Sequence, residues 1–132
     1  MKSKQIIRFY FSAGDINKAL DNLILDKALK SANYEKSGEF YAEQIAEIIA
    51  AKGELSLLWG YLDGVIKNFT KKERSVLKFY GGLRVGASKF EPEVFREIRR
   101  VLMKFRRHAV NLERFGEGVR LVREYYCLFK SG

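Results

Sequence analysis

The clearest pattern in this chain is a run of apolar residues at alternating spacings of four and three. The members of this seam are Tyr41, Ile45, Ile48, Lys52, Leu55, Trp59, Leu62, Ile66 and Phe69, of which only Lys52 is polar. Such spacing places side chains on one side of an α-helix over four heptads. It predicts a helix over residues 39–69, roughly 45 Å long at the rise of an α-helix.

Small residues also occur in this segment, and they let another helix approach closely. They are Ala46, Ala50, Ala51, Gly53, Gly60 and Gly64. The segment carries charged side chains between them, including Glu54 and Lys67, and is therefore not a membrane span. We therefore predict that these small residues allow close packing between helices of a soluble protein.

Two segments are predicted before the seam. Residues 4–12 fit a short amphipathic helix that contains Ile6, Ile7, Phe9, Tyr10 and Phe11, and their aromatic and β-branched content leaves a strand as the alternative. Asp15 is a candidate N-cap, and apolar residues at helical spacing then predict a helix over residues 16–33.

A capping box follows the seam. Thr70 can accept a hydrogen bond from the backbone of Glu73, and the Glu73 carboxylate can reach back to Thr70. A helix is therefore predicted from Lys71, and the pair Gly81 and Gly82 is expected to end it as C-terminal capping glycines.

The next predicted helix has Pro92 in its first turn and two contrasting faces. Its apolar face comprises Val94, Phe95, Ile98, Val101, Leu102, Phe105, Ala109 and Leu112. Its basic face comprises Arg96, Arg99, Arg100, Lys104, Arg106 and Arg107. Apolar residues continue at helical spacing to Phe129, either in the same helix or in a separate one after a turn near Gly116.

These elements predict an all-α fold of five or six helices around one long central helix at about residues 39–69. The length of 132 residues suits a single helical domain, residues 1–132, with one hydrophobic core. A single proline in the whole chain agrees with long helices.

Charge is distributed unevenly along the chain. The formal net charge is +9, and residues 1–70 contribute none of it, so residues 71–132 carry all of the excess. A basic half of this kind attracts polyanions such as nucleic acid, an anionic membrane surface or an acidic protein. The alternative is that the excess charge only keeps the protein soluble.

The residue inventory gives little support for catalysis. His108 is the only histidine and Cys127 the only cysteine, so we expect no metal site and no disulfide. The glycine-rich segments lack the residues of a phosphate-binding loop or a dinucleotide fingerprint. We therefore expect no enzyme activity, no catalytic residues and no cofactor. No signal peptide and no transmembrane segment is recognisable, which predicts a cytoplasmic protein without a membrane partner.

The basic face is the best candidate for function. Arginine and lysine bind phosphates through charge and forked hydrogen bonds. A helix that reads bases also needs Asn, Gln, Ser or Thr, and none lies between Glu91 and Ala109. Contact with a nucleic-acid backbone is therefore predicted rather than base readout, and the alternative is a solvated face.

Two blocks of sequence also match a known pattern. The first block matches the pattern at Glu73, Arg74, Val76, Leu77, Tyr80, Gly82 and Leu83, and it contains one glycine more than the pattern. The second block is the basic run from Ile98 to Arg107. Residues 69–107 in this way resemble the C-terminal helix-turn-helix region of bacterial RNA polymerase sigma factors. Only residues 85–97 separate the blocks, so the helix and turn that the family has between them are missing. The resemblance implies binding to DNA or RNA polymerase.

We therefore expect a non-enzymatic binding protein that contacts nucleic acid or the transcription machinery through the basic face. The alternative is a helical oligomer or adaptor that binds an acidic protein partner and has no role with nucleic acid. The seam is longer than a core of this size needs, so a homodimer is a further expectation. The residues expected to form the core or an oligomer interface are Ile45, Ile48, Leu55, Trp59, Leu62 and Ile66.

Overall fold

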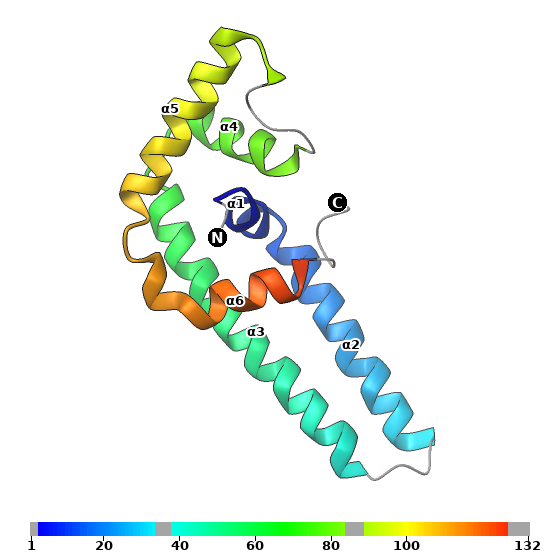
Figure 1. The fold of residues 1–132 in the computed structure, drawn as a ribbon. Coiled ribbons are helices and arrows are strands. Elements are labelled where there is room, and N and C mark those ends of the chain that lie inside the picture. The colour runs from blue at the N-terminus through cyan, green and yellow to red at the C-terminus, as the bar shows by residue number, and fades with distance from the viewer. Residues whose placement is uncertain (1–2, 34–37, 84–88, 127–132) are drawn as a thin grey trace.

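The computed structural model describes residues 3–33, 38–83 and 89–126. These residues form six α-helices and one short 3-10 helix, without any strand (Figure 1). The helices are α1 (Ser3–Phe11), α2 (Ala13–Asn33), α3 (Gly38–Ile66), α4 (Lys71–Gly82), α5 (Pro92–His108) and α6 (Gly116–Glu124), and the 3-10 helix is η2 (Leu112–Phe115). The all-α prediction is confirmed, as is the long central helix, which has 29 residues.

The predicted seam of α3 faces the interior. Ile48, Leu55, Leu62 and Ile66 are buried, and Ile45 and Trp59 are partly buried. A second buried row on the same helix, Ala51 and Leu58, widens the contact surface. The wider surface arises because α3 packs against α2 and α1 and also against α6.

The first segment is a helix, which settles the choice between helix and strand. α1 buries Ile6, Ile7 and Phe9 and lies against α4. Contact is close at Gly81, where an added Cβ would lie 3.2 Å from the backbone nitrogen of Arg8. Gly81 therefore lets α1 and α4 approach closely at this crossing. The helix end at Gly82 is confirmed, but the expected capping role is wrong, since no described glycine has a positive φ.

α2 and the first half of α3 form an antiparallel arm that extends away from the other helices (Figure 1). Lys52, the polar member of the seam, pairs with Asp21 of α2 and so brings its charge to the edge of the arm. α2 begins at Ala13, three residues before the predicted start, and Asp15 lies in its first turn instead of at the N-cap.

The last part of the chain turns away from α5. α5 ends at His108, and α6 is a separate helix that begins at Gly116. α6 packs closely on α3, because a Cβ on Gly118 would lie 3.0 Å from the Cβ of Leu58 and 3.1 Å from the backbone oxygen of Glu54. None of the helices in the described ranges is long and apolar enough to cross a membrane.

Two leucines of α3 test which side of the helix holds the core. Leu62 is fully buried and Leu57 is 61% exposed. We expect Leu62→Ala to lower the free energy of unfolding by about 3 kcal/mol, because it leaves a cavity. Leu57→Ala, the matched control, should change it by less than about 0.5 kcal/mol. Urea denaturation followed by Trp59 fluorescence measures both values, and equal losses would contradict the assigned faces.

Candidate nucleic-acid interface on helix α5

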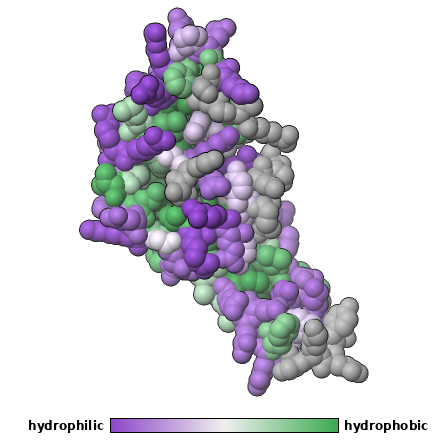
Figure 2. Space-filling model, viewed as in Figure 1, coloured by the Kyte–Doolittle hydropathy of each residue, from purple (hydrophilic) through white to green (hydrophobic). Residues whose placement is uncertain are grey.

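The sequence of α5 favours a helix because it has suitable residues at both ends and apolar residues along one side. Pro92 occupies its first turn, Glu93 complements the positive end of the helix dipole, and Arg106 and Arg107 complement the negative end. Four residues of the apolar face fix the helix to the core: Ile98, Val101, Leu102 and Phe105. The opposite side remains in solvent, and hydrophilic side chains project along the edge of the molecule where α5 lies (Figure 2).

The Glu73 carboxylate joins α4 to α5. The predicted capping box is present: Thr70 donates its backbone N–H to Oε1 of Glu73 at 2.9 Å, and its Oγ1 accepts from the Glu73 backbone at 3.1 Å. Lys104 Nζ donates to the same Oε1 at 2.8 Å, and Arg100 Nη1 donates to Oε2 at 3.2 Å. The Glu73 side chain is only 6% exposed, so both cations accompany a nearly buried anion.

These donors favour the ionised form of the carboxyl group. The hydrogen bond from Lys104, followed by the one from the Thr70 backbone, lowers the pKa of Glu73 to about 2. Burial acts in the opposite direction and is outweighed. Glu73 is therefore ionised near neutral pH, as its pairing with Lys104 and Arg100 requires.

The six residues of the predicted basic face have different surroundings. Arg100 binds Glu73 and Glu97, and Lys104 binds Glu73 and also lies over the Phe69 ring, 4.6 Å from its centre. Arg106 donates from Nε to Ser3 Oγ at 3.2 Å. The three others, Arg96, Arg99 and Arg107, are exposed, and the described residues provide no hydrogen bond or ion pair to them.

The three free arginines lie on one strip of α5. At 100° per residue, Arg96, Arg99 and Arg107 fall within a sector of about 80°. Met103 lies in the same sector and is 49% exposed. From Arg96 to Arg107 the strip is about 17 Å long. We call these four residues the arginine strip.

The arginine strip offers hydrogen-bond donors and positive charge with no acceptor. A guanidinium group is always protonated and presents a planar fork that matches a phosphate or a carboxylate. The strip can therefore bind anions but cannot move protons.

His108 does not add a proton-transfer group to the arginine strip. Its Nδ1 donates to the backbone oxygen of Lys104 at 2.8 Å, and its ring lies edge-on to Phe69, so it closes the end of the helix. Cys127, the single cysteine of the sequence, lies outside the described residues. In the described ranges, no three His, Cys, Asp or Glu side chains are grouped closely enough to hold a metal ion.

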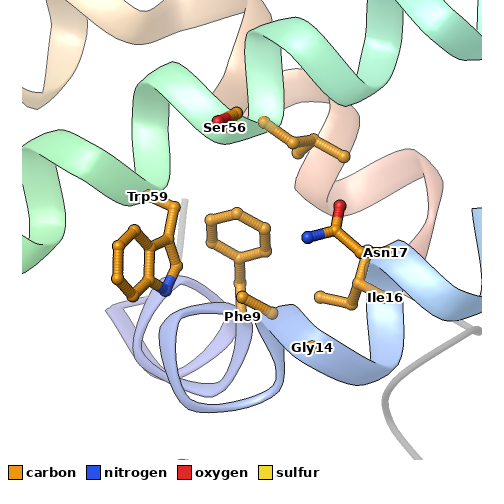
Figure 3. Close-up of a pocket in the computed structure, with 8 residues that line it drawn as sticks. Phe9, Gly14, Ile16, Asn17, Ser56 and Trp59 are labelled. Atoms are coloured by element: carbon orange, nitrogen blue, oxygen red, sulfur yellow. The ribbon is translucent and has the colours of Figure 1, made fainter.

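A cleft that the sequence did not indicate lies between α3 and the start of α2. Its volume is about 290 Å³, and the rings of Phe9 and Trp59 lie beside each other in it, with Asn17 facing them (Figure 3). Trp59 is held there, because it stacks on Tyr10 and donates from Nε1 to the Tyr10 carbonyl at 3.0 Å. The described residues that line the cleft are apolar or uncharged, with Asn17 and Ser56 as its polar side chains.

A second hollow, a shallow groove of about 420 Å³, runs between α4 and α5. Val76, Phe79, Val94 and Ile98 make it apolar, and two of them are largely exposed: Phe79 at 51% and Val94 at 42%. Helical periodicity identifies these positions only as apolar. The groove becomes visible only once the two helices are placed side by side.

The geometry thus defines an all-α protein in which helix α5 is held against α4 by Glu73 and presents exposed arginines to solvent. Comparison with family models, curated proteins and solved structures gives no match for the chain.

The pKa of Glu73 provides a test of the bridge. A carboxyl group whose pKa falls on folding stabilises the folded state when it is ionised, and this contribution disappears as the pH drops through the folded pKa. Glu73→Gln should therefore be less stable than the original protein near neutral pH. The difference should shrink as the pH falls from 4.5 towards about 2, the ordinary and lowered pKa values. Urea denaturation across this range measures it.

Glu117→Gln is the matched control. Glu117 pairs with Arg120 on the surface of α6, where both side chains are more than half exposed. Exposed pairs contribute little, so this variant should differ only slightly from the original protein at each pH. A deficit in Glu73→Gln that stayed constant down to the lowest pH would mean that ionisation of Glu73 does not stabilise the fold.

Proposed function

We propose that this protein is a non-enzymatic binding protein that attaches to the phosphate backbone of nucleic acid through the arginine strip of α5. The observation that carries the proposal is the set of three exposed arginines, Arg96, Arg99 and Arg107, to which the described residues provide no hydrogen bond or ion pair. They lie in the half of the chain that holds the whole net charge. Neighbouring cations on one helix repel each other, so an anion that binds among them relieves that repulsion.

The dimensions of the strip fit a row of phosphates. Its length of about 17 Å corresponds to roughly five nucleotide steps along one strand at 3.4 Å per step. The Glu73 bridge holds α5 along the flank of the strip, so the strip lies on a braced element. With no Asn, Gln, Ser or Thr on α5, binding would follow the backbone without reading bases.

The resemblance of residues 69–107 to sigma factors supports a place in a transcription complex. The two blocks that carry the resemblance contain the partners of the bridge: Glu73 in the first, Arg100 and Lys104 in the second. Contact between the blocks is consistent with one DNA-binding unit, although the helix between them is missing.

One observation favours a second candidate, an acidic protein partner. Met103 lies in the middle of the arginine strip and is 49% exposed. Arg and Met are both enriched at protein interfaces, whereas a phosphate backbone gains nothing from a thioether. In an adaptor that binds acidic proteins, Met103→Ala would weaken binding, and in a protein that binds phosphates it would have no effect.

Binding to a fluorescent DNA duplex over a salt series tests the proposal. We expect Arg99→Gln with Arg107→Gln to weaken binding at low salt. The slope of log affinity against log salt should become shallower by about 1.8, because each lost phosphate contact contributes about 0.9.

The control is Lys18→Gln with Arg123→Gln, which removes the same charge from exposed sites on α2 and α6. It should leave the slope nearly unchanged. Equal losses in the two double variants would mean that attraction is spread over the surface. No binding at low salt would eliminate nucleic acid as the partner and favour the acidic protein.

A further inference from the structure

The side of α3 that faces away from the seam is exposed and carries no charge. Its residues, spaced four, three, four, four, three and four, are Ala42, Ala46, Ile49, Gly53, Leu57, Gly60 and Gly64. At 100° per residue all seven fall within about 80° of each other. We call them the outer α3 face. Ile49 is 56% exposed and Leu57 61%, so two large apolar side chains of this face lie in solvent.

Packing within the chain does not explain this face. A Cβ added at Gly53, Gly60 or Gly64 would have no atom within 4 Å, so these glycines face open space. The predicted close helix packing at these three glycines is thus absent from the described chain. α3 packs against α1, α2, α5, α6 and η2, but no described residue lies against these three glycines.

The order of residues on the outer α3 face is symmetric about Gly53. Ile49 and Leu57 lie four residues before and after it, Ala46 and Gly60 seven, and Ala42 and Gly64 eleven. Two copies of α3 that run antiparallel and cross at Gly53 would place each large residue opposite a large one. Each small residue would meet a small one.

The charges at the ends follow the same symmetry. Glu39 lies fourteen residues before Gly53, and Lys67 fourteen residues after it. Antiparallel pairing brings Lys67 of one copy beside Glu39 of the other, whereas parallel pairing puts like charges together. Lys67 still continues the helix, since its N–H donates to the Asp63 carbonyl at 2.9 Å.

We propose that the outer α3 face binds a second copy of this chain, with the two α3 helices antiparallel and the two-fold axis at Gly53. Such an interface is isologous, because the same residues serve both subunits. The mirrored sequence favours a second copy as the occupant, since a helix of a different protein would not require matching positions on both sides of Gly53. An anionic lipid surface would need cations along the face, and its seven positions have none.

The size of the face limits the affinity. From Ala42 to Gly64 it extends about 33 Å, and a helix about 10 Å wide then buries about 330 Å² per subunit. Stable interfaces bury about 800 Å² per partner, so the dimer should be reversible. Dissociation in the micromolar range is expected rather than a permanent dimer. This inference does not depend on the arginine strip.

Sedimentation equilibrium of the full chain from low to high micromolar concentration tests the proposal. The expected result is a concentration-dependent change from monomer to dimer mass. Leu57→Glu should weaken the dimer at least tenfold, because it places two carboxylates against Ile49 in a dry contact. Leu25→Glu is the control, since Leu25 is 58% exposed on α2 and lies outside the face.

Folding is checked by circular dichroism, and both variants should retain the helical signal because both positions are exposed. A chain that stays monomeric at every concentration would overturn the proposal. So would a dimer weakened by Leu25→Glu but not by Leu57→Glu. Arg99→Gln with Arg107→Gln should leave the dimer unchanged, so failure of the dimer and failure of nucleic-acid binding are separate results.

Cross-linking tests the direction of the helices. In a Cys127→Ser background, chains with Ala46→Cys and chains with Gly60→Cys are treated with a short bismaleimide, separately and mixed. Antiparallel pairing predicts a covalent dimer mainly in the mixture, because position 46 of one copy faces position 60 of the other. Efficient cross-linking of either variant alone would overturn the antiparallel arrangement.

Discussion

The Glu73 carboxylate holds α5 in place against α4, and the arginine strip depends on that position. One side chain completes the capping box with Thr70 and also receives Lys104 and Arg100 from the next helix. A carboxylate that is nearly buried would be costly if it were unpaired, because it has lost its water. Its two cationic partners offset that cost. They also leave α5 with one flank of paired charges and one strip of arginines that no described residue pairs with.

The division of the basic face into paired and unpaired residues changes what the charge can do. Arg100 and Lys104 are on the exposed half of an amphipathic helix by periodicity, yet both serve the fold through Glu73. A polyanion that recruited them would have to compete with a carboxylate already in place. Arg96, Arg99 and Arg107 need no such exchange, so they carry the argument for binding.

Sequence periodicity was enough for the features that depend on neighbours along one helix. It predicted the all-α class, the seam that includes Ile48, Leu55 and Leu62, and the capping box of α4. It could not predict that Glu73 would also contact α5. Its partners Arg100 and Lys104 are separated from it by 27 and 31 positions in the sequence. It also gave Gly81 the wrong role, since the local pattern of a helix end cannot reveal that α1 crosses there. Periodicity could not predict the cleft beside Phe9 and Trp59 for the same reason, because the cleft forms between segments that are far apart in the sequence.

The two proposals assign different binding surfaces to different helices. α3 uses one side for the core and leaves its outer face for a second copy, while α5 uses one side for the core and leaves arginines in solvent. Two subunits joined through α3 would carry two arginine strips related by a two-fold axis. A second strip on the same assembly binds at an effective concentration set by the subunit geometry, which raises avidity without new contacts. Each strip alone offers only a few phosphate contacts, and the α3 interface is small. Nucleic acid that engages both strips would therefore favour the dimer, and dimerisation would in turn strengthen the binding of nucleic acid.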